Sequence, residues 1–326
     1  MKQWLFKVMS VVMLLPWLSL PASAEELQEL TFVLDYTPNT NHTGLYVAAE
    51  KGYFEEEGLA VNIMMPPEDG APVLVASGSA QLGMDYQDSL ASTYAQSTPL
   101  PVTNIAAVIQ HNTSGIISPK NREIISPKDM EGKRYASWGS MVEQAIIKNV
   151  VQSDGGDPNK VEMVNNTQAS ITNLDQSDID AIWVFYAWDG IAAQVKDIPV
   201  NYFPFIDYND TFDYYTPTII ANNAFLKDNP EVVKAFLRAV KKGYEFAMEH
   251  PEEAAQILVE AHPELDQDIV TESQKYLADK YVADAPKWGY IDAERWDRFY
   301  TWLAEEGLIA QEIPKGYGFT NDYLPE

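Results

Sequence analysis

The chain has 326 residues, of which 46% are hydrophobic and 21% are charged, and it contains no cysteine. This composition can bury one or two substantial cores, and it excludes a disordered chain, disulfides and zinc-thiolate sites. The formal net charge of -26 at pH 7 is unfavourable for binding nucleic acid or anionic lipid surfaces. We therefore expect a soluble acidic protein with two lobes and no nucleic-acid partner.

Residues 1–24 follow the plan of a secretory signal peptide. Lys2 and Lys7 precede an apolar run at 8–20, and small residues at 21–24 form a cleavage site. A membrane anchor is the alternative, but a run of about 13 residues falls short of the roughly 20 that span a bilayer. We expect cleavage near Ala24. Because no cysteine is present for lipid attachment, we expect the mature protein in a periplasm.

Short apolar, β-branched runs alternate with amphipathic stretches, a pattern typical of parallel strands joined by crossover helices. The first part of the chain predicts strands at 30–34, 60–65 and 81–85, with helices at 43–51 and 70–77. A longer strand is predicted at 102–109. It is long enough to leave one lobe and enter the next.

The following segment repeats this order. It predicts a helix that begins at Ser126, strands at 134–137, 161–165 and 179–186, and a helix at 140–153. A strand at 216–222 returns the chain to the first lobe, and helices follow from 230 and at 252–261, 268–281 and 292–307. The expected plan is lobe 1 at 25–112, lobe 2 at 113–215, and a return with C-terminal helices at 216–326. Two crossing strands form the hinge.

Polar and aromatic residues follow the predicted strands. In open α/β sheets, ligands bind outside the C-terminal ends of the strands, where loops and helix N-termini converge. The loops at these ends are 35–42, 66–70, 85–88, 138–140, 165–167 and 186–189. The first of them, DYTPNTNH, is expected to form one wall of a small-molecule cleft.

These loops are rich in aromatic side chains. Planar faces suit a flat heteroaromatic ligand, because offset stacking adds about 0.5 to 1.5 kcal/mol beyond the burial of area. Core packing is the alternative for each of them, and it is the expectation for Trp183 and Phe185 on the strand before the last loop. The candidates for stacking are Tyr36, Tyr86, Trp138, Tyr186 and Trp188.

The polar members of the loops match the same kind of ligand. Carboxylate and amide groups can pair with a ring that presents an exocyclic amine beside a ring nitrogen, although the aspartates are also ordinary helix caps. Gly139 allows close backbone approach, and the N–H groups after it can donate to a carbonyl or carboxylate. The polar candidates are Asp35, Asn39, Asp85, Gln87 and Asp189.

The sequence contains few motifs that indicate catalysis. The four histidines are scattered, and the chain has no phosphate loop, no Gly-x-Ser-x-Gly and no His-Glu-x-x-His motif. We therefore expect a protein that is not an enzyme, with no catalytic residue, no metal and no cofactor.

Several motifs in order resemble the periplasmic binding proteins for formylaminopyrimidine: LTFVLDYTPNTNHTGLYVAAEKGYFEEEGL, PPEDGAPVLVASG, ISPKDMEGKRYASWGS and WVFYAWDGI. Proteins of this family deliver a thiamine-breakdown pyrimidine to an ABC transporter for salvage. The resemblance implies an α/β, type II periplasmic binding fold with two lobes, a two-strand hinge and capture by closure. It also implies a membrane permease as partner and a receptor that works as a monomer.

The expected ligand is N-formyl-4-amino-5-aminomethyl-2-methylpyrimidine. Asp35 would accept from its exocyclic amine, Tyr36 and an aromatic residue of the opposite lobe would sandwich its ring, and the turn at 138–140 would meet its substituent. The full set of expected ligand-binding residues is Asp35, Tyr36, Asn39, His42, Tyr86, Gln87, Trp138, Gly139, Ser140, Tyr186, Trp188 and Asp189.

Two alternatives stay open. A receptor of this superfamily can bind riboflavin, another flat vitamin-like ring or a sulfonate, although a sulfonate favours arginines and the loops contain none. The alternative of another class is an enzyme that resembles the pyrimidine synthase, which uses pyridoxal phosphate on a lysine near a histidine. The matching positions here are about Asp85 and Ser89, and the cysteine-rich run of that enzyme is missing.

Overall fold

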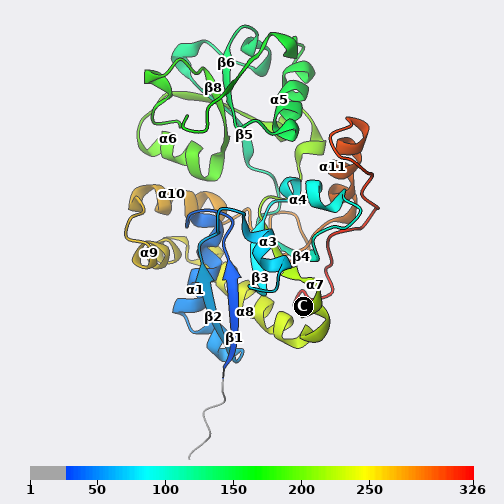
Figure 1. Cartoon of the computed structure of the whole chain (residues 1–326). Coiled ribbons are helices and arrows are strands. Elements are labelled where there is room, and N and C mark those ends of the chain that lie inside the picture. Colours follow the sequence, from blue (N-terminus) through cyan, green and yellow to red (C-terminus); the bar gives the residue numbers. More distant parts are fainter. Residues whose placement is uncertain (1–26) are drawn as a thin grey trace, which may run out of the picture.

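The computed structural model describes residues 27–326, and the expected signal peptide lies outside the described residues. Two five-stranded sheets form the centres of two lobes. Figure 1 shows one lobe above the other, with the N- and C-terminal parts of the described chain together in the lower one. Within residues 27–326, we find no helix with the length and apolar character that crossing a membrane requires.

Lobe 1, the lower lobe in Figure 1, is built from two separate stretches of chain. The first stretch contains β1 (Gln28–Val33), α1 (Thr43–Glu50), α2 (Tyr53–Glu56), β2 (Leu59–Met64), α3 (Ala71–Ala76), β3 (Leu82–Asp85), α4 (Gln87–Tyr94) and β4 (Val102–Ala107). The second contains β10 (Thr218–Asn222), α7 (Asn223–Asp228), α8 (Pro230–Glu249), α9 (Pro251–Ala261), α10 (Gln267–Leu277) and α11 (Ala293–Glu305). The strand order is β2-β1-β3-β10-β4, with β10 antiparallel to both of its neighbours.

Lobe 2 is formed by the chain between these stretches. It contains β5 (Ser114–Pro119), β6 (Arg134–Ser137), α5 (Met141–Ser153), β7 (Glu162–Asn165), β8 (Ala181–Phe185), α6 (Ile191–Val195) and β9 (Val200–Pro204). A π-helical turn, Tyr186–Gly190, joins β8 to α6. The strand order is β7-β6-β8-β5-β9, with β5 antiparallel to β8 and β9.

The sequence-based prediction of strands and helices differs from the structure at several places. β5 and β9 were not predicted, and the strand expected at 102–109 ends at Ala107. It ends there because the next backbone groups bond elsewhere: Val108 N–H donates to Pro217 O and Gln110 N–H to Lys280 O. The helix expected from Ser126 is only a 3-10 turn, Pro127–Met130.

Apolar side chains cover both faces of the lobe 1 sheet. On one face Phe32 stacks on Phe236 with ring centroids 5.6 Å apart, and Phe54 stacks on Phe236 at 5.7 Å. Val33, the next residue of β1, belongs to the cluster on the opposite face. Successive side chains of β1 thus point to opposite faces of the sheet, as expected for a strand that is buried on both sides. Each buried phenylalanine stabilises the lobe by about 1.5–3 kcal/mol.

A close contact between α1 and α8 positions the loop that precedes α1. A Cβ on Gly243 would lie 2.0 Å from Gly44 O, so only glycine permits this approach of the two backbones. The next residue of α8, Tyr244, donates its hydroxyl to Asn41 O at 2.6 Å. The 3-10 turn Thr40–His42, which opens α1, is therefore held directly by the core of lobe 1.

Two irregular segments, 108–113 and 205–217, connect the lobes between β4 and β5 and between β9 and β10. His111 joins them, because its Nδ1 lies 2.7 Å from Asp213 Oδ2 and its Nε2 lies 2.9 Å from Asp284 Oδ1. From α11, Arg295 Nε lies 3.6 Å from Asp213 Oδ2. A charged cluster thus ties both crossing segments to lobe 1 at the hinge.

The cluster predicts a pH-dependent stability. The hydrogen bond with Asp213 raises the pKa of His111 above its ordinary value of 6.5, against burial and Arg295, and Asp284 adds to the rise. The stabilisation is therefore fully present below about pH 6.5 and lost as the pH rises through the raised value. We expect the difference in unfolding free energy between wild type and His111→Gln, measured by urea unfolding, to shrink between about pH 6 and pH 8.5.

His250→Gln is the matched control, since His250 is exposed and lies away from the hinge. Its difference from wild type should stay small at every pH. A His111→Gln difference that does not change with pH would contradict the assignment.

Candidate functional site

A pocket with a volume of about 370 Å³ lies between the lobes, next to the C-terminal ends of β1, β3 and β8. This volume falls within the range of about 300–1,000 Å³ that is typical of small-molecule sites. Lobe 1 supplies the loop before α1 and one residue after β3, and lobe 2 supplies the end of β8 and the π-helical turn. The lining residues are Tyr36, Asn39, Thr40, Asn41, Tyr86, Phe185, Ala187, Trp188 and Asp189.

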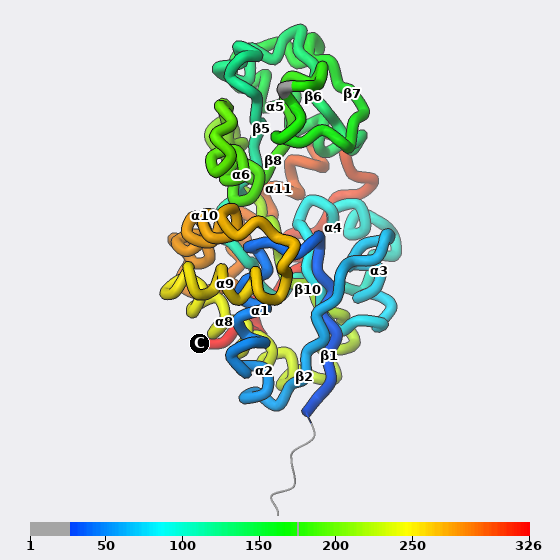
Figure 2. The backbone as a smooth tube through the Cα atoms, turned by 90° about the vertical axis from the view of Figure 1, so that its left-hand side faces the viewer, coloured from blue at the N-terminus to red at the C-terminus, as the bar shows by residue number. Residues whose placement is uncertain are grey.

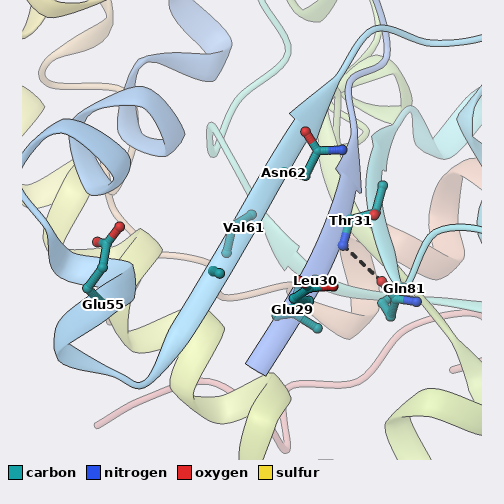
Figure 3. Close-up of a pocket in the computed structure, with 8 residues that line it drawn as sticks. Glu29, Leu30, Thr31, Glu55, Val61, Asn62 and Gln81 are labelled. Carbon is teal, nitrogen blue, oxygen red and sulfur yellow. Dashed lines mark hydrogen bonds between the residues drawn. The ribbon is translucent and has the colours of Figure 1, made fainter. Parts of the chain in front are cut away.

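A larger hollow, of about 640 Å³, lies on the side of lobe 1. Figure 3 shows its side chains spread over β1, β2, α2 and Gln81, with Thr31 N–H bonded to Gln81 Oε1. All of its lining residues belong to lobe 1, and none of them is aromatic. Closure of the lobes cannot enclose a ligand there, so the pocket between the lobes is the candidate site.

The Asp35 carboxylate organises the lobe 1 wall of the pocket. Its Oδ1 lies 2.6 Å from His42 Nε2, and its Oδ2 accepts the hydroxyl of Tyr86. His42 Nδ1 accepts from Asn39 N–H at 3.1 Å, which places the donated proton on Nε2. The side chains of Asp35 and His42 are fully buried. Asp35 therefore lies behind the lining, with both oxygens engaged.

The charge on Asp35 is maintained by these partners. Burial by itself would raise the pKa of this carboxyl, but the interaction with His42 and the hydrogen bonds from His42 and Tyr86 outweigh it and lower the pKa. Burial and the neighbouring Asp35 raise the pKa of Tyr86 well above its ordinary value. The Tyr86 hydroxyl therefore stays protonated and acts as the donor.

Aromatic rings from both lobes meet in the pocket. Tyr86 stacks on Phe185 with ring centroids 5.9 Å apart and planes inclined by 14°. Phe185 was expected to pack in the core, and this expectation was wrong: it lines the pocket. Trp183 does pack against the core, with its ring 4.3 Å from Phe205. Tyr36 is 61% exposed, so one of its faces is open for contact.

Three carboxyl groups with raised pKa values lie in the pocket lining, at the end of β3 and at the start of α4. Burial raises the pKa of Asp189, which lines the pocket, to about 6. Burial likewise raises the pKa of Asp88 to about 6 and that of Asp85 to about 7. The described residues that line the pocket include no lysine or arginine. The site therefore favours ligands with N–H donors or positive charge over anions.

Two expected site residues serve packing instead of the pocket lining. The Gln87 amide donates to Trp296 O and accepts from Tyr215 N–H, both at 2.9 Å, and it is fully buried. The Tyr186 ring lies between Tyr202 and Tyr276, at centroid distances of 4.6 and 5.3 Å.

The turn Trp138–Ser140 lies at the end of β6, outside the pocket lining. The N–H groups that follow Gly139 were expected to be able to donate to a ligand carbonyl or carboxylate. Within the turn, Glu143 Oε2 accepts from Trp138 N–H at 3.2 Å, and Ser137 Oγ accepts from Gly139 N–H at 3.0 Å. Ser140 caps α5 by accepting from Glu143 N–H. The Trp138 and Gly139 N–H groups are thus bonded within the chain itself.

The predicted set of ligand-binding residues missed Thr40, Asn41 and Ala187 as well as Phe185. Thr40 lies inside the loop expected to form the wall, but its hydroxyl looked like an ordinary component of a turn. Ala187 has no functional group, and it lines the pocket only through its position in the π-helical turn. The loops at 66–70 and 165–167 follow strands as expected but do not reach the pocket lining.

Comparisons with known proteins identify the family of the chain. The family model described as NMT1/THI5 like matches residues 39–254. The chain is 31% identical over 321 residues to the formylaminopyrimidine-binding protein of Halalkalibacterium halodurans, which covers 94% of this chain and 96% of the relative. It is 23% identical to riboflavin-binding protein RibY of Chloroflexus aurantiacus, over 94% of this chain and 88% of that one.

An enzyme is also among the relatives. The 4-amino-5-hydroxymethyl-2-methylpyrimidine phosphate synthase of Aspergillus parasiticus is 26% identical over 247 residues, which are 72% of this chain and 71% of the relative. Family membership alone therefore does not separate a receptor from an enzyme.

Solved structures share the fold. The alkanesulfonate-binding protein SsuA from Xanthomonas axonopodis pv. citri, bound to MOPS, has a TM-score of 0.68 at 12% identity and covers 90% of this chain and 99% of that one. SsuA from Escherichia coli also has a TM-score of 0.68, at 15% identity over 88% and 90% of the two chains. The expected type II periplasmic binding fold is confirmed, and the chain belongs to the NMT1/THI5-like family.

Proposed function

We propose that this protein is the solute-binding component of an ABC transporter and that it captures a thiamine-related aminopyrimidine, N-formyl-4-amino-5-aminomethyl-2-methylpyrimidine, for salvage. The observation that carries the proposal is a pocket between two lobes that combines aromatic faces with a carboxylate and, among its described lining residues, no cationic side chain. The similarity to the H. halodurans protein supports this class of cargo.

The ring of the ligand stacks between Tyr36 and Trp188 in this proposal. A third ring between two others needs roughly 7 Å, twice a carbon–carbon contact of about 3.5 Å. Tyr86 and Phe185 are only 5.9 Å apart, so they already use these faces on each other. Tyr36 from lobe 1 and Trp188 from lobe 2 also line the pocket, and Tyr36 is 61% exposed.

Asp189 accepts from the exocyclic amine, and Asn41 lines the same pocket from the opposite lobe. Asp35 acts through its neighbours in this proposal, because both of its oxygens already hold His42 and Tyr86. By accepting from the Tyr86 hydroxyl, Asp35 holds the Tyr86 ring in its stacked contact with Phe185. In this arrangement Asp189 of lobe 2 bonds to the exocyclic amine, and aromatic side chains from both lobes contact the planar ring of the ligand.

The receptor role requires export to a periplasm and closure that a membrane permease recognises. Closure follows from differential affinity, since a ligand that touches both lobes binds the closed state better. The enzyme alternative lacks its chemistry here. Asp85 and Ser89 stand at the positions that resemble the synthase lysine and histidine, and the chain has no cysteine. A sulfonate finds no cation among the lining residues described.

Isothermal titration calorimetry of the protein without residues 1–24 tests the cargo. We expect binding of the formylaminopyrimidine at one site per chain, with a dissociation constant at or below about 1 μM, or about −8 kcal/mol. MOPS and the phosphorylated hydroxymethylpyrimidine are the controls, and neither should bind to a pocket without cations. No heat and no thermal shift at about 1 mM ligand, far above that constant, would refute the assignment.

The pH dependence of binding tests the role of Asp189. Its pKa is raised to about 6 by burial, so the carboxylate form needed to accept from an amine is lost as the pH falls through that value. We expect affinity to be about tenfold weaker at pH 5 than at pH 7, because each pH unit below the pKa corresponds to a factor of about ten. Asp189→Asn should bind weakly and with no such slope. Affinity that rises towards pH 5 would show that the protonated acid donates to the ring instead.

A double-mutant cycle tests whether Asp35 acts through Tyr86. Asp35→Asn should weaken binding by about 1.5–3 kcal/mol, the usual contribution of a hydrogen bond to a charged group. If Asp35 only holds Tyr86, then Tyr86→Phe added to Asp35→Asn should cost little more than the single change. Additive losses would indicate that Asp35 contacts the ligand directly.

A further inference from the structure

A buried chain of hydroxyl groups joins the two walls of the pocket through α10. Ser273 Oγ donates to Ala187 O in the π-helical turn of lobe 2. Thr40 Oγ1 lies 2.5 Å from Ser273 Oγ. Because Ser273 has a single hydroxyl proton, which Ala187 O accepts, Thr40 is the donor to Ser273. The order of donation is therefore Thr40 to Ser273 to Ala187.

These three residues are enclosed by protein. Ser273 is 0% exposed, Thr40 1% and Ala187 4%. Thr40 and Ala187 both line the pocket, one from each lobe, whereas Ser273 lies behind them. A polar contact sealed from water is costly to leave unmade, so the position of Ala187 depends on Ser273 as long as the lobes are together.

Helix α10 is itself anchored to lobe 1. Gln274 Nε2 donates to Ala247 O of α8 at 3.2 Å, and Gln274 is fully buried. Tyr281, just after α10, donates its hydroxyl to Thr40 O at 2.9 Å. Ser273, which bonds to lobe 2, therefore lies on a helix that is fixed to the same core as the lobe 1 wall of the pocket.

Lobe 2 rests on α10 through more than this one bond. The rings of Tyr186 and Tyr276 lie 5.3 Å apart, and Trp188 packs against an apolar cluster that contains Val270. Figures 1 and 2 both show α10 facing α6 across the boundary between the lobes. The π-helical turn therefore meets lobe 1 at α10, in addition to the bond that Tyr186 N–H donates to Thr113 O at the end of one crossing segment.

We propose that Ser273 is a positioning residue that holds the π-helical turn, and with it Trp188 and Asp189, against lobe 1 in the closed state. Its bond to Ala187 exists only when the lobes are together, so it favours closure over opening. The link to cargo rests on the proposed function, because Trp188 and Asp189 are the residues assigned to the ligand there. The closure itself is a property of the chain without ligand.

The test measures the distance between the lobes in ligand-free protein. The chain has no cysteine, so Lys148→Cys on α5 and Lys227→Cys on α7 introduce unique, exposed sites for spin labels. We expect double electron–electron resonance to give one main distance between the two spin labels in the parent protein. Ser273→Ala should add a second population with the lobes further apart.

Matched variants separate positioning from general destabilisation. Thr271→Ala removes a hydroxyl from the same helix, but that hydroxyl donates to Gln267 O on the surface, so this variant should match the parent. Ser273→Thr keeps the donor and should restore the single distance. Thr40→Val, which leaves the bond from Ser273 to Ala187, should fall between the parent and Ser273→Ala. Identical distance distributions for the parent and Ser273→Ala would overturn the proposal.

Ligand kinetics provide a separate readout. Ser273→Ala should raise the dissociation rate of the formylaminopyrimidine about tenfold, since the closed state that holds the ligand then lacks this bond. An unchanged dissociation rate would contradict the positioning role. If the parent protein binds no aminopyrimidine, the proposed cargo fails, while the distance measurement still decides on Ser273.

Discussion

The buried carboxylate of Asp35 is the interaction on which the candidate site depends. A charge at the end of a central strand is costly unless hydrogen bonds compensate it, and here His42 and Tyr86 supply them. The bond to His42 fixes the 3-10 turn before α1, and the bond to Tyr86 fixes the start of α4. One wall of the pocket is therefore formed before any ligand arrives, which lowers the entropic cost of binding.

The opposite wall is of a different kind. Trp188 and Asp189 are carried by a π-helical turn, and the place of this turn depends on contacts between the lobes at α10 and on the hinge cluster around His111. The lobe 1 wall of the pocket is held by bonds within its own lobe, whereas the position of the lobe 2 wall depends on contacts with lobe 1. Such a division suits a receptor, because the ligand contributes most to the state in which the two walls face each other.

The family uses one fold for receptors and for enzymes, so the residues of the site must separate the two. In this chain Asp85 is buried, its Oδ2 has no hydrogen-bond partner among the described residues, and burial raises its pKa to about 7. Such a group cannot form a Schiff base, which needs an amine. The position that resembles the synthase lysine therefore holds no amine in this chain.

Local signals in the sequence determined the strands β1 to β3, the helix α5 and the loop at 35–42, because periodicity, caps and turn residues act over a few positions. The antiparallel strand β5 was decided by partners in β8 and β9, more than 60 residues away along the chain. The same limit applied to side chains. Nothing local distinguishes Gln87, which binds the backbone at Trp296, from Asn41 in the pocket, or the packed Tyr186 from the pocket-lining Phe185. Residue types and strand ends therefore identified the region of the site, whereas the role of each side chain depended on neighbours that only the folded chain brings within contact distance.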